Sequence, residues 1–147
     1  MIKEASVAEM NKLKIAKERR VLVNRGRGND ELAPSDDLYE DMMARKAALE
    51  KELGKGSAEA HNRAFIDCDF ERRFTEQIVN DPSAMKKLKE IVRRAETGDI
   101  YLVCYEGPTK ACHRRILMRI AERAYQARVA VTGIEPPCRQ DVFGSSG

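Results

Sequence analysis

The chain has 147 residues, of which 35% are charged and none is tryptophan, and its 27 Lys and Arg residues against 24 Asp and Glu residues leave a net charge of only +3. This length is enough for one domain with a real hydrophobic core. The charge balance is too small to indicate nucleic-acid binding by itself, so any basic surface must be local. No apolar run resembles a signal peptide or reaches the roughly 20 residues of a membrane span, so we expect a cytoplasmic protein without membrane contact.

The first elements of the chain are predicted from capping residues and a short apolar run. Ser6, with Glu9 three residues later, forms a capping box that opens a helix through about Glu18. The sequence RVLVN at residues 20–24 is typical of a compact strand. Residues 25–30 are then the turn after that strand.

Three further helices follow. Ser35 caps the first of them, which ends at Gly54 and is followed by a loop at residues 54–57. The next begins near Asp69 and the last begins at Asp81-Pro82. Their apolar positions repeat at helical spacing, namely Leu38, Met42, Leu49 and Leu53, then Phe70, Phe74 and Ile78, then Met85, Leu88, Ile91, Val92 and Ala95.

The most informative stretch is IYLVCYEGPTKACHRR at residues 100–115. Its apolar start predicts a central strand, on which Cys104 and Glu106 share one face. Thr109 is expected to cap the next helix, so that Lys110, Ala111 and Cys112 form its first turn. A thiol in that position should be more acidic than a free cysteine. His113 then begins the face that packs on the sheet, with its ring near Glu106.

The order of strands and helices predicts a single α/β domain, a small parallel sheet covered by helices and layered as in Rossmann-like proteins. We place it at residues 1–143, with RVAVT at 128–132 as its last strand and a flexible tail at 144–147. The carboxyl ends of parallel strands meet at one edge. That edge would form an anion-binding pocket from three segments, namely Asn24 with Arg25 and Arg27, then residues 106–115, then residues 133–139.

Each candidate residue also has a structural interpretation. Cys104 is either a secondary reactive thiol or a small core residue, and His113 is either reactive or a hydrogen-bonded core histidine. Arg114 and Arg115 are either a solvated face or, because they oppose the helix dipole, side chains with an anionic partner. The cysteines, Cys68 and Cys138 included, show no CxxC pairs and are most simply reduced.

Three functional classes remain open. The first is a thiol-dependent enzyme acting on a phosphorylated small molecule or nucleotide, with Cys112 as nucleophile and His113 or Glu106 as base or orienting group. The second is a non-catalytic nucleotide or nucleic-acid binding module. The third is a metal site, although zinc ligands usually show a paired spacing that is missing here. No cofactor follows from the sequence. The anion-binding set in the first two classes is Asn24, Arg25, Arg27, Thr109, Lys110, Arg114 and Arg115, and the metal set is Cys104, Glu106, Cys112 and His113.

Two motifs carry a resemblance to a known family. LVCYEGPTKACHRR, together with RVLVNR at residues 20–25 and LAPS at residues 32–35, resembles the domain-of-unknown-function family 488 (DUF488), whose members have a strand ending in Cys-Tyr-Glu and a helix opening with Cys-His-Arg. The resemblance covers roughly residues 20–121. Asn24 stands where the family usually has an aspartate, and the segment 50–63 lacks the tryptophan expected there. The resemblance implies a fold and a site without naming a substrate.

Overall fold

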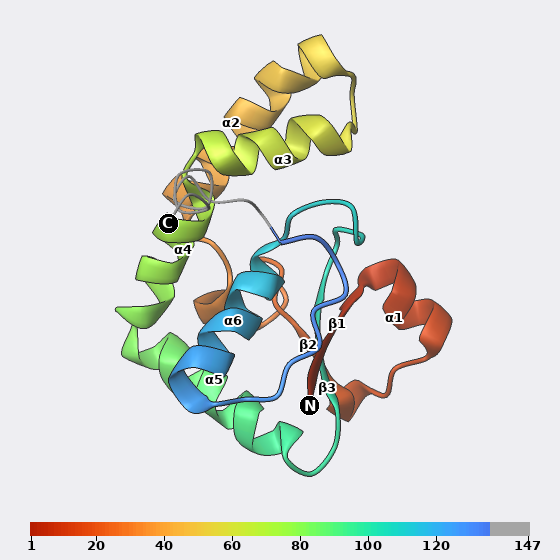
Figure 1. Cartoon of the computed structure of the whole chain (residues 1–147), viewed down its shortest axis with the longest axis vertical. Helices are drawn as coiled ribbons and strands as arrows, with labels where there is room; N and C mark the ends of the chain where they lie inside the picture. Colours follow the sequence, from red (N-terminus) through yellow and green to blue (C-terminus); the bar gives the residue numbers. More distant parts are fainter. Residues whose placement is uncertain (136–147) are drawn as a thin grey trace, which may run out of the picture.

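The computed structural model describes residues 1–135, which form a three-stranded parallel sheet and six α-helices (Figure 1). The strands are β1 (Ile2–Ser6), β2 (Arg20–Leu22) and β3 (Ile100–Cys104), in the order β1-β3-β2. The predicted α/β fold class and the central position of β3 are confirmed. Ser6 pairs with Cys104, and Leu22 pairs with Val103, so all three strands end at the same edge of the sheet.

The sheet differs from the prediction at its outer strand. β1 was not predicted, because its five residues are polar and apolar in mixed order and include Glu4, which the fold buries. The predicted strand at 128–132 is wrong, since only Val129 forms a bridge, to Ile2. The Ile2 amide donates to the carbonyl of Arg128 (2.8 Å) and the Ala130 amide donates to the carbonyl of Ile2 (2.9 Å). This segment therefore lies along β1 without becoming a regular strand.

One face of the sheet is covered by α1 (Val7–Leu13) (Figure 1). The capping box of Ser6 and Glu9 is present, with both reciprocal hydrogen bonds. The helix is shorter than predicted because Lys14 adopts a left-handed conformation (φ 52°) and ends it. Residues 17–19 form only a 3-10 turn before β2. Met10 packs on this face against two buried sheet residues, Ala5 and Val103.

The opposite face carries the main core and is covered by α5 (Pro82–Ala95) and α6 (His113–Tyr125), and α4 (Phe70–Val79) packs on these two helices (Figure 1). The helical spacing predicted the inward faces of α4 and α5 correctly. The buried residues of α4 and α5 include Phe70, Phe74, Ile78, Leu88, Ile91 and Ala95. α6 begins three residues later than expected, which affects the site described below.

α2 (Asp36–Leu53) and α3 (Ala58–Asp67) form a helical hairpin that projects beyond the sheet (Figure 1). α2 was predicted, and its cap is present, because the Ser35 hydroxyl accepts from the Leu38 amide. α3 was not predicted. Ser57 caps it in the same way, accepting from the Ala60 amide at 3.2 Å. α3 runs back toward the carboxyl edge of the sheet and brings His61 to that edge.

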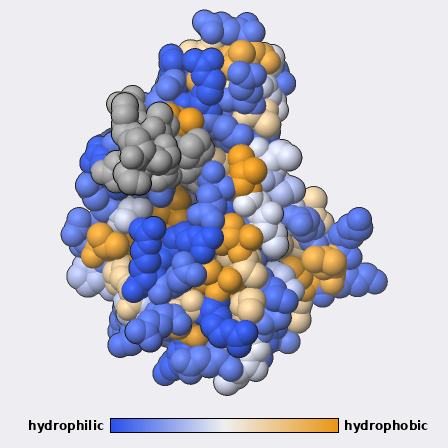
Figure 2. Space-filling view, viewed as in Figure 1, coloured by the Kyte–Doolittle hydropathy of each residue, from blue (hydrophilic) through white to orange (hydrophobic). Residues whose placement is uncertain are grey.

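On the face shown in Figure 2, apolar residues are scattered among hydrophilic ones. Among the described residues, no helix is long and apolar enough to cross a membrane. The predicted tail at 144–147, Cys138 and the last part of the 133–139 segment lie outside the described residues.

Candidate active site

A cavity of about 300 Å³ lies at the carboxyl edge of the sheet. Its walls come from the residues after β2, from α2 and α3, from the residues after β3 and from the start of α6. The site residues predicted from sequence that line it are Asn24, Arg25, Cys104, Glu106, Cys112 and His113. Segments that are far apart in the sequence are therefore brought together here.

Two thiols face one imidazole in this cavity. Cys104 ends β3, Cys112 is the N-cap of α6, and His113 is the first residue of that helix. The Nε2–H of His113 donates to the carbonyl of Val23 at 2.8 Å. In the neutral ring, Nδ1 is then a proton acceptor. Nδ1 lies 3.8 Å from the sulfur of Cys112 and 4.0 Å from the sulfur of Cys104. The ring of Phe74 packs against the imidazole edge to face, with 5.4 Å between ring centroids.

The environment separates the acidities of the two thiols. Burial by itself would raise the pKa of Cys112, but the hydrogen bond from Cys104 and the positive charges of His113 and Arg114 lower this pKa well below its usual range. The pKa of Cys104 is raised, because its thiol donates to Cys112 and is itself buried. Burial opposes protonation of His113, yet the charge of Cys112 and the bonds to Cys112 and Val23 raise the pKa of the imidazole. Both shifts favour a Cys112 thiolate beside an imidazolium.

The loop between β3 and α6 is held by α3. Thr109 is not the helix cap, because the Asn62 side chain takes the polar groups of this loop instead. It donates to the carbonyl of Thr109 at 3.0 Å and accepts from the amide of Ala111 at 2.8 Å. Residues 109 and 110 therefore form a turn, and neither lines the cavity. Cys104 and Glu106 do point the same way, with 3.9 Å from the Cys104 sulfur to the carboxylate.

Arg114 and Arg115 point away from the cavity into the protein. Both are 1% exposed, and the Nε atom of each donates to the same carboxylate oxygen of Glu4 at 2.9 Å. The other oxygen of Glu4 accepts from the amides of Thr132 (3.0 Å) and Gly133 (3.4 Å). The anionic partner expected for these two arginines is thus Glu4 of β1. Arg115 also donates to three carbonyls, which fixes the neighbouring loops.

The cations after β2 divide between the cavity and the surface. Arg25 lines the cavity, pairs with Asp36 and lies 4.2 Å from the ring centroid of Tyr39. Arg27 lies outside it and donates to the hydroxyl of Tyr105 at 3.1 Å. Because Arg114 and Arg115 are buried, the five basic residues of the predicted anion-binding set do not share one surface.

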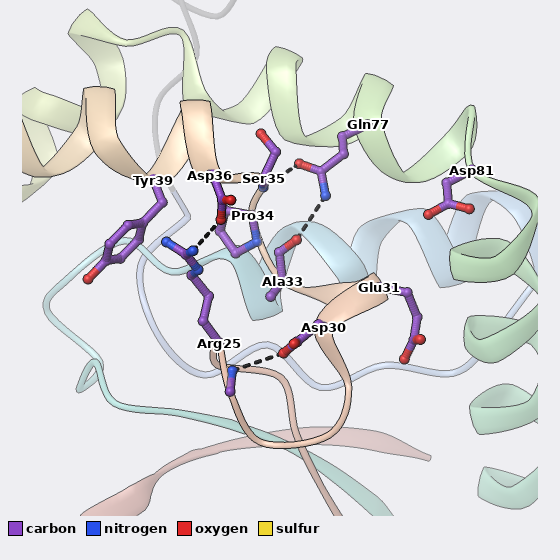
Figure 3. A pocket seen from close by; sticks show the side chains of 11 residues that line it. Arg25, Asp30, Glu31, Ala33, Pro34, Ser35, Asp36, Tyr39, Gln77 and Asp81 are labelled. Carbon is purple, nitrogen blue, oxygen red and sulfur yellow. Dashed lines mark hydrogen bonds and ion pairs between the residues drawn. The ribbon is translucent and has the colours of Figure 1, made fainter.

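A second, more open depression of about 670 Å³ adjoins the cavity (Figure 3). Arg25, Pro34 and Tyr39 line both spaces. Figure 3 shows the Arg25 guanidinium turned toward Asp36, beside the ring of Tyr39. The open depression carries carboxylates, Glu31 among them, but no thiol or imidazole. Of these two spaces, only the smaller cavity is lined by thiols and imidazoles.

Sequence reasoning missed the two basic residues that α2 and α3 bring to the cavity, Lys46 and His61. The Nε2–H of His61 donates to the carbonyl of Ala111 at 2.7 Å, while its Nδ1 is buried with no hydrogen-bond partner among the described residues. Burial lowers the pKa of His61, although the bond to Ala111 opposes this shift. The signal that was available is Ser57 as a cap, followed by Ala60, His61 and Ala64 at helical spacing.

The ligand atoms of Cys104, Cys112 and His113 all lie within 4.8 Å of one another, which is a suitable cluster for a metal ion. Nε2 of His113 donates to the backbone carbonyl of Val23, and metal-bound histidines usually make such a bond with the ring nitrogen that does not hold the metal. Thiolate and imidazole ligands favour zinc.

The fold and the site define a parallel α/β protein with a thiol and imidazole cluster at the carboxyl edge of its sheet. Residues 14–124, more than half of the chain, match the family DUF488-N3a, described as the active DUF488-N3 subclade. The chain belongs to this family, which confirms the resemblance found from the two motifs. Comparisons with curated proteins and with solved structures gave no match.

Proposed function

We propose that the protein is a cysteine-dependent enzyme that acts on a small anionic molecule bound in the cavity. The observation that supports this most directly is the orientation of His113. Its Nε2–H is committed to Val23, so its Nδ1 is left to accept a proton from the thiol of Cys112.

The chemistry follows from these positions. Nδ1 of His113 takes the thiol proton, and the Cys112 thiolate attacks an electrophilic carbon of the substrate. A sulfur–carbon bond forms, and the leaving group departs with its bonding electrons and receives the proton from the imidazolium. Nδ1 of His113 then takes a proton from a water molecule, which attacks the same carbon. The sulfur–carbon bond breaks, and the thiolate and the imidazolium are both restored. Cys104 keeps its proton and donates to the thiolate between turnovers.

The anion is assigned to the two cations that line the cavity. Arg25 offers a planar guanidinium, and Lys46 has no ion pair or hydrogen bond within the described part of the chain. The fixed positive charge of Arg25 is partly neutralised by Asp36, which an incoming anion would displace. A phosphate or carboxylate group on the substrate fits these cations.

The test compares two thiols of the same protein. Cys112 should be labelled by iodoacetamide at neutral pH, because its pKa is lowered, whereas Cys68 should need alkaline pH, because burial and nearby carboxylates raise its pKa. Peptide mass spectrometry across a pH series gives both rates. Equal pH profiles at the two positions, or an inert Cys112, would remove the nucleophile from the proposal. Loss of the Cys112 signal in Cys112→Ser, with Cys68 unchanged, is the control for assignment.

A zinc site is the second candidate, favoured by the cluster of Cys104, Cys112 and His113. With water as the fourth ligand, it would have the three protein ligands of a catalytic zinc site, and with Glu106 it would have the four protein ligands of a structural one. Elemental analysis of the purified protein separates the two candidates. Stoichiometric zinc, with Cys112 becoming reactive only after a chelator is added, would support the metal site and displace the free thiolate.

A further inference from the structure

Two buried polar groups of the cavity have no partner within the described residues, and neither belongs to the thiol and imidazole cluster. They are the side-chain amide of Asn24, which is 5% exposed, and Nδ1 of His61, in a side chain that is 2% exposed. A buried polar atom without a hydrogen bond is costly, and most such atoms in proteins are paired. Both residues line the cavity, so a ligand bound there is the candidate partner for these atoms.

The two groups require different partners. Because Nε2 of His61 donates to the carbonyl of Ala111, Nδ1 of the neutral ring only accepts. It therefore calls for an N–H or O–H donor on the ligand. The amide of Asn24 offers one acceptor and two donors side by side, the pattern with which asparagine contacts the edge of a nucleobase.

The remaining walls suit a flat ring. Phe65, Phe70 and Tyr39 line the cavity with their rings, and Met42 and Met43 add adaptable apolar side chains. Arg25 and Lys46 lie on the same cavity and provide positive charge. The volume of about 300 Å³ is at the small end of the range for ligand sites.

We propose that the cavity binds a nucleoside monophosphate, with Asn24 and His61 contacting the edge of the base and Arg25 and Lys46 contacting the phosphate. The inference rests on the proposed function for the position of the reactive thiol, but ligand binding is measured separately from chemistry. The base is recognised by neutral hydrogen bonds and ring contacts, and the phosphate by charge. Both parts of the ligand are therefore needed for full affinity.

The test is isothermal titration calorimetry with the adenine, guanine, cytosine and uracil nucleoside 5′-monophosphates, with ribose 5-phosphate and inorganic phosphate as base-free probes. At least one nucleotide should bind the wild-type protein about tenfold or more tightly than ribose 5-phosphate. Equal affinity for the nucleotides and ribose 5-phosphate, or no binding of any nucleotide at millimolar concentration, would overturn the inference.

The variants separate recognition from folding. Asn24→Ala should weaken nucleotide binding about tenfold with a melting temperature near that of the wild type, because its amide makes no hydrogen bond in the free protein. Asn11→Ala, on the exposed surface of α1, is the matched control. His61→Gln retains a donor for Ala111 but removes Nδ1, and it should also weaken binding. Unchanged affinity in both Asn24→Ala and His61→Gln would refute the assignment.

Failure of this inference is distinguishable from failure of the proposed function. If Cys112 is labelled at neutral pH but no nucleotide binds, the thiol chemistry stands and the nucleotide assignment falls. If a nucleotide binds equally well to Cys112→Ala and the wild-type thiol is inert, the recognition site stands and the nucleophile falls.

Discussion

Removal of the Glu4 side chain should lower the stability of the protein sharply. It is buried, and it accepts hydrogen bonds from Arg114, Arg115 and two backbone amides. Glu4→Ala would leave two guanidinium groups buried without their carboxylate. Breaking a buried ion pair in this way costs about 3 to 5 kcal/mol. In a chain of this length, each kcal/mol of lost stability lowers the melting temperature by about 3 °C. The melting temperature of Glu4→Ala should therefore fall by about 10 to 15 °C.

The assay is thermal unfolding followed by circular dichroism, with Glu90→Ala as the matched control. Glu90 pairs with Arg93 on the surface, where both side chains are more than half exposed, so its removal should change the melting temperature little. Glu4→Gln keeps the shape of the side chain but loses its charge. The melting temperature of this variant should lie between those of Glu4→Ala and Glu90→Ala. A loss in Glu4→Ala no greater than that in Glu90→Ala would refute the reasoning.

Three further predictions follow from contacts within the site and the core. His113→Gln keeps a donor toward Val23 but removes Nδ1, so the pH at which iodoacetamide labels Cys112 should rise toward that of a free cysteine. An unchanged pH profile of labelling would exclude His113 as the base. Phe74→Ala should destabilise the protein by about 3 to 5 kcal/mol in urea titrations, because the ring is fully buried against His113, and a cost below about 1 kcal/mol would contradict this packing. Arg114→Ala should lower the melting temperature equally with and without phosphate, because its partner is Glu4; restoration by phosphate would instead favour an anion site at Arg114.

The parts of the fold that sequence predicted are those with strong local signals. Ser35 and Asp81 cap their helices as expected, and the spacing of Phe70, Phe74 and Ile78 identified the buried face of α4. These signals lie within one turn or one helix. The elements that were missed or misplaced depend on tertiary contacts.

β1 and α6 illustrate that dependence. A charged residue such as Glu4 is normally exposed, so the sequence does not indicate a buried strand at residues 2–6. Glu4 is buried because Arg114 and Arg115 face it. Thr109 is a good cap by residue type, but Asn62 of α3 binds the loop around it and moves the helix start to His113. Neither partner is close in sequence, so no local pattern contained the information.

The candidate site was predicted in part for the same reason. Cys112 and His113 are neighbours in the chain, and Cys104 precedes them by one loop, so their meeting could be inferred from one strand and one turn. His61 enters the site on α3, whose apolar positions are mostly alanine, which gives a weak periodic signal. His61 reaches the cavity because its ring bonds to the carbonyl of Ala111, which is distant in sequence.

The strand order has a consequence for synthesis on the ribosome. Among the described strands, β1 and β2 pair with β3 and not with each other, and the additional bridge of β1 is to Val129, which is made later still. The two strands made first therefore have no sheet partner until residues 100–104 exist. At translation speeds of about 5 to 20 residues per second, that wait is about 5 to 20 seconds. During this time the apolar strand edges are open to other chains, a hazard for nascent proteins. Val23 and Cys104 contact His113 only after β3 has been inserted into the sheet. The thiol of Cys112 therefore keeps the pKa of an ordinary cysteine until most of the chain has been made.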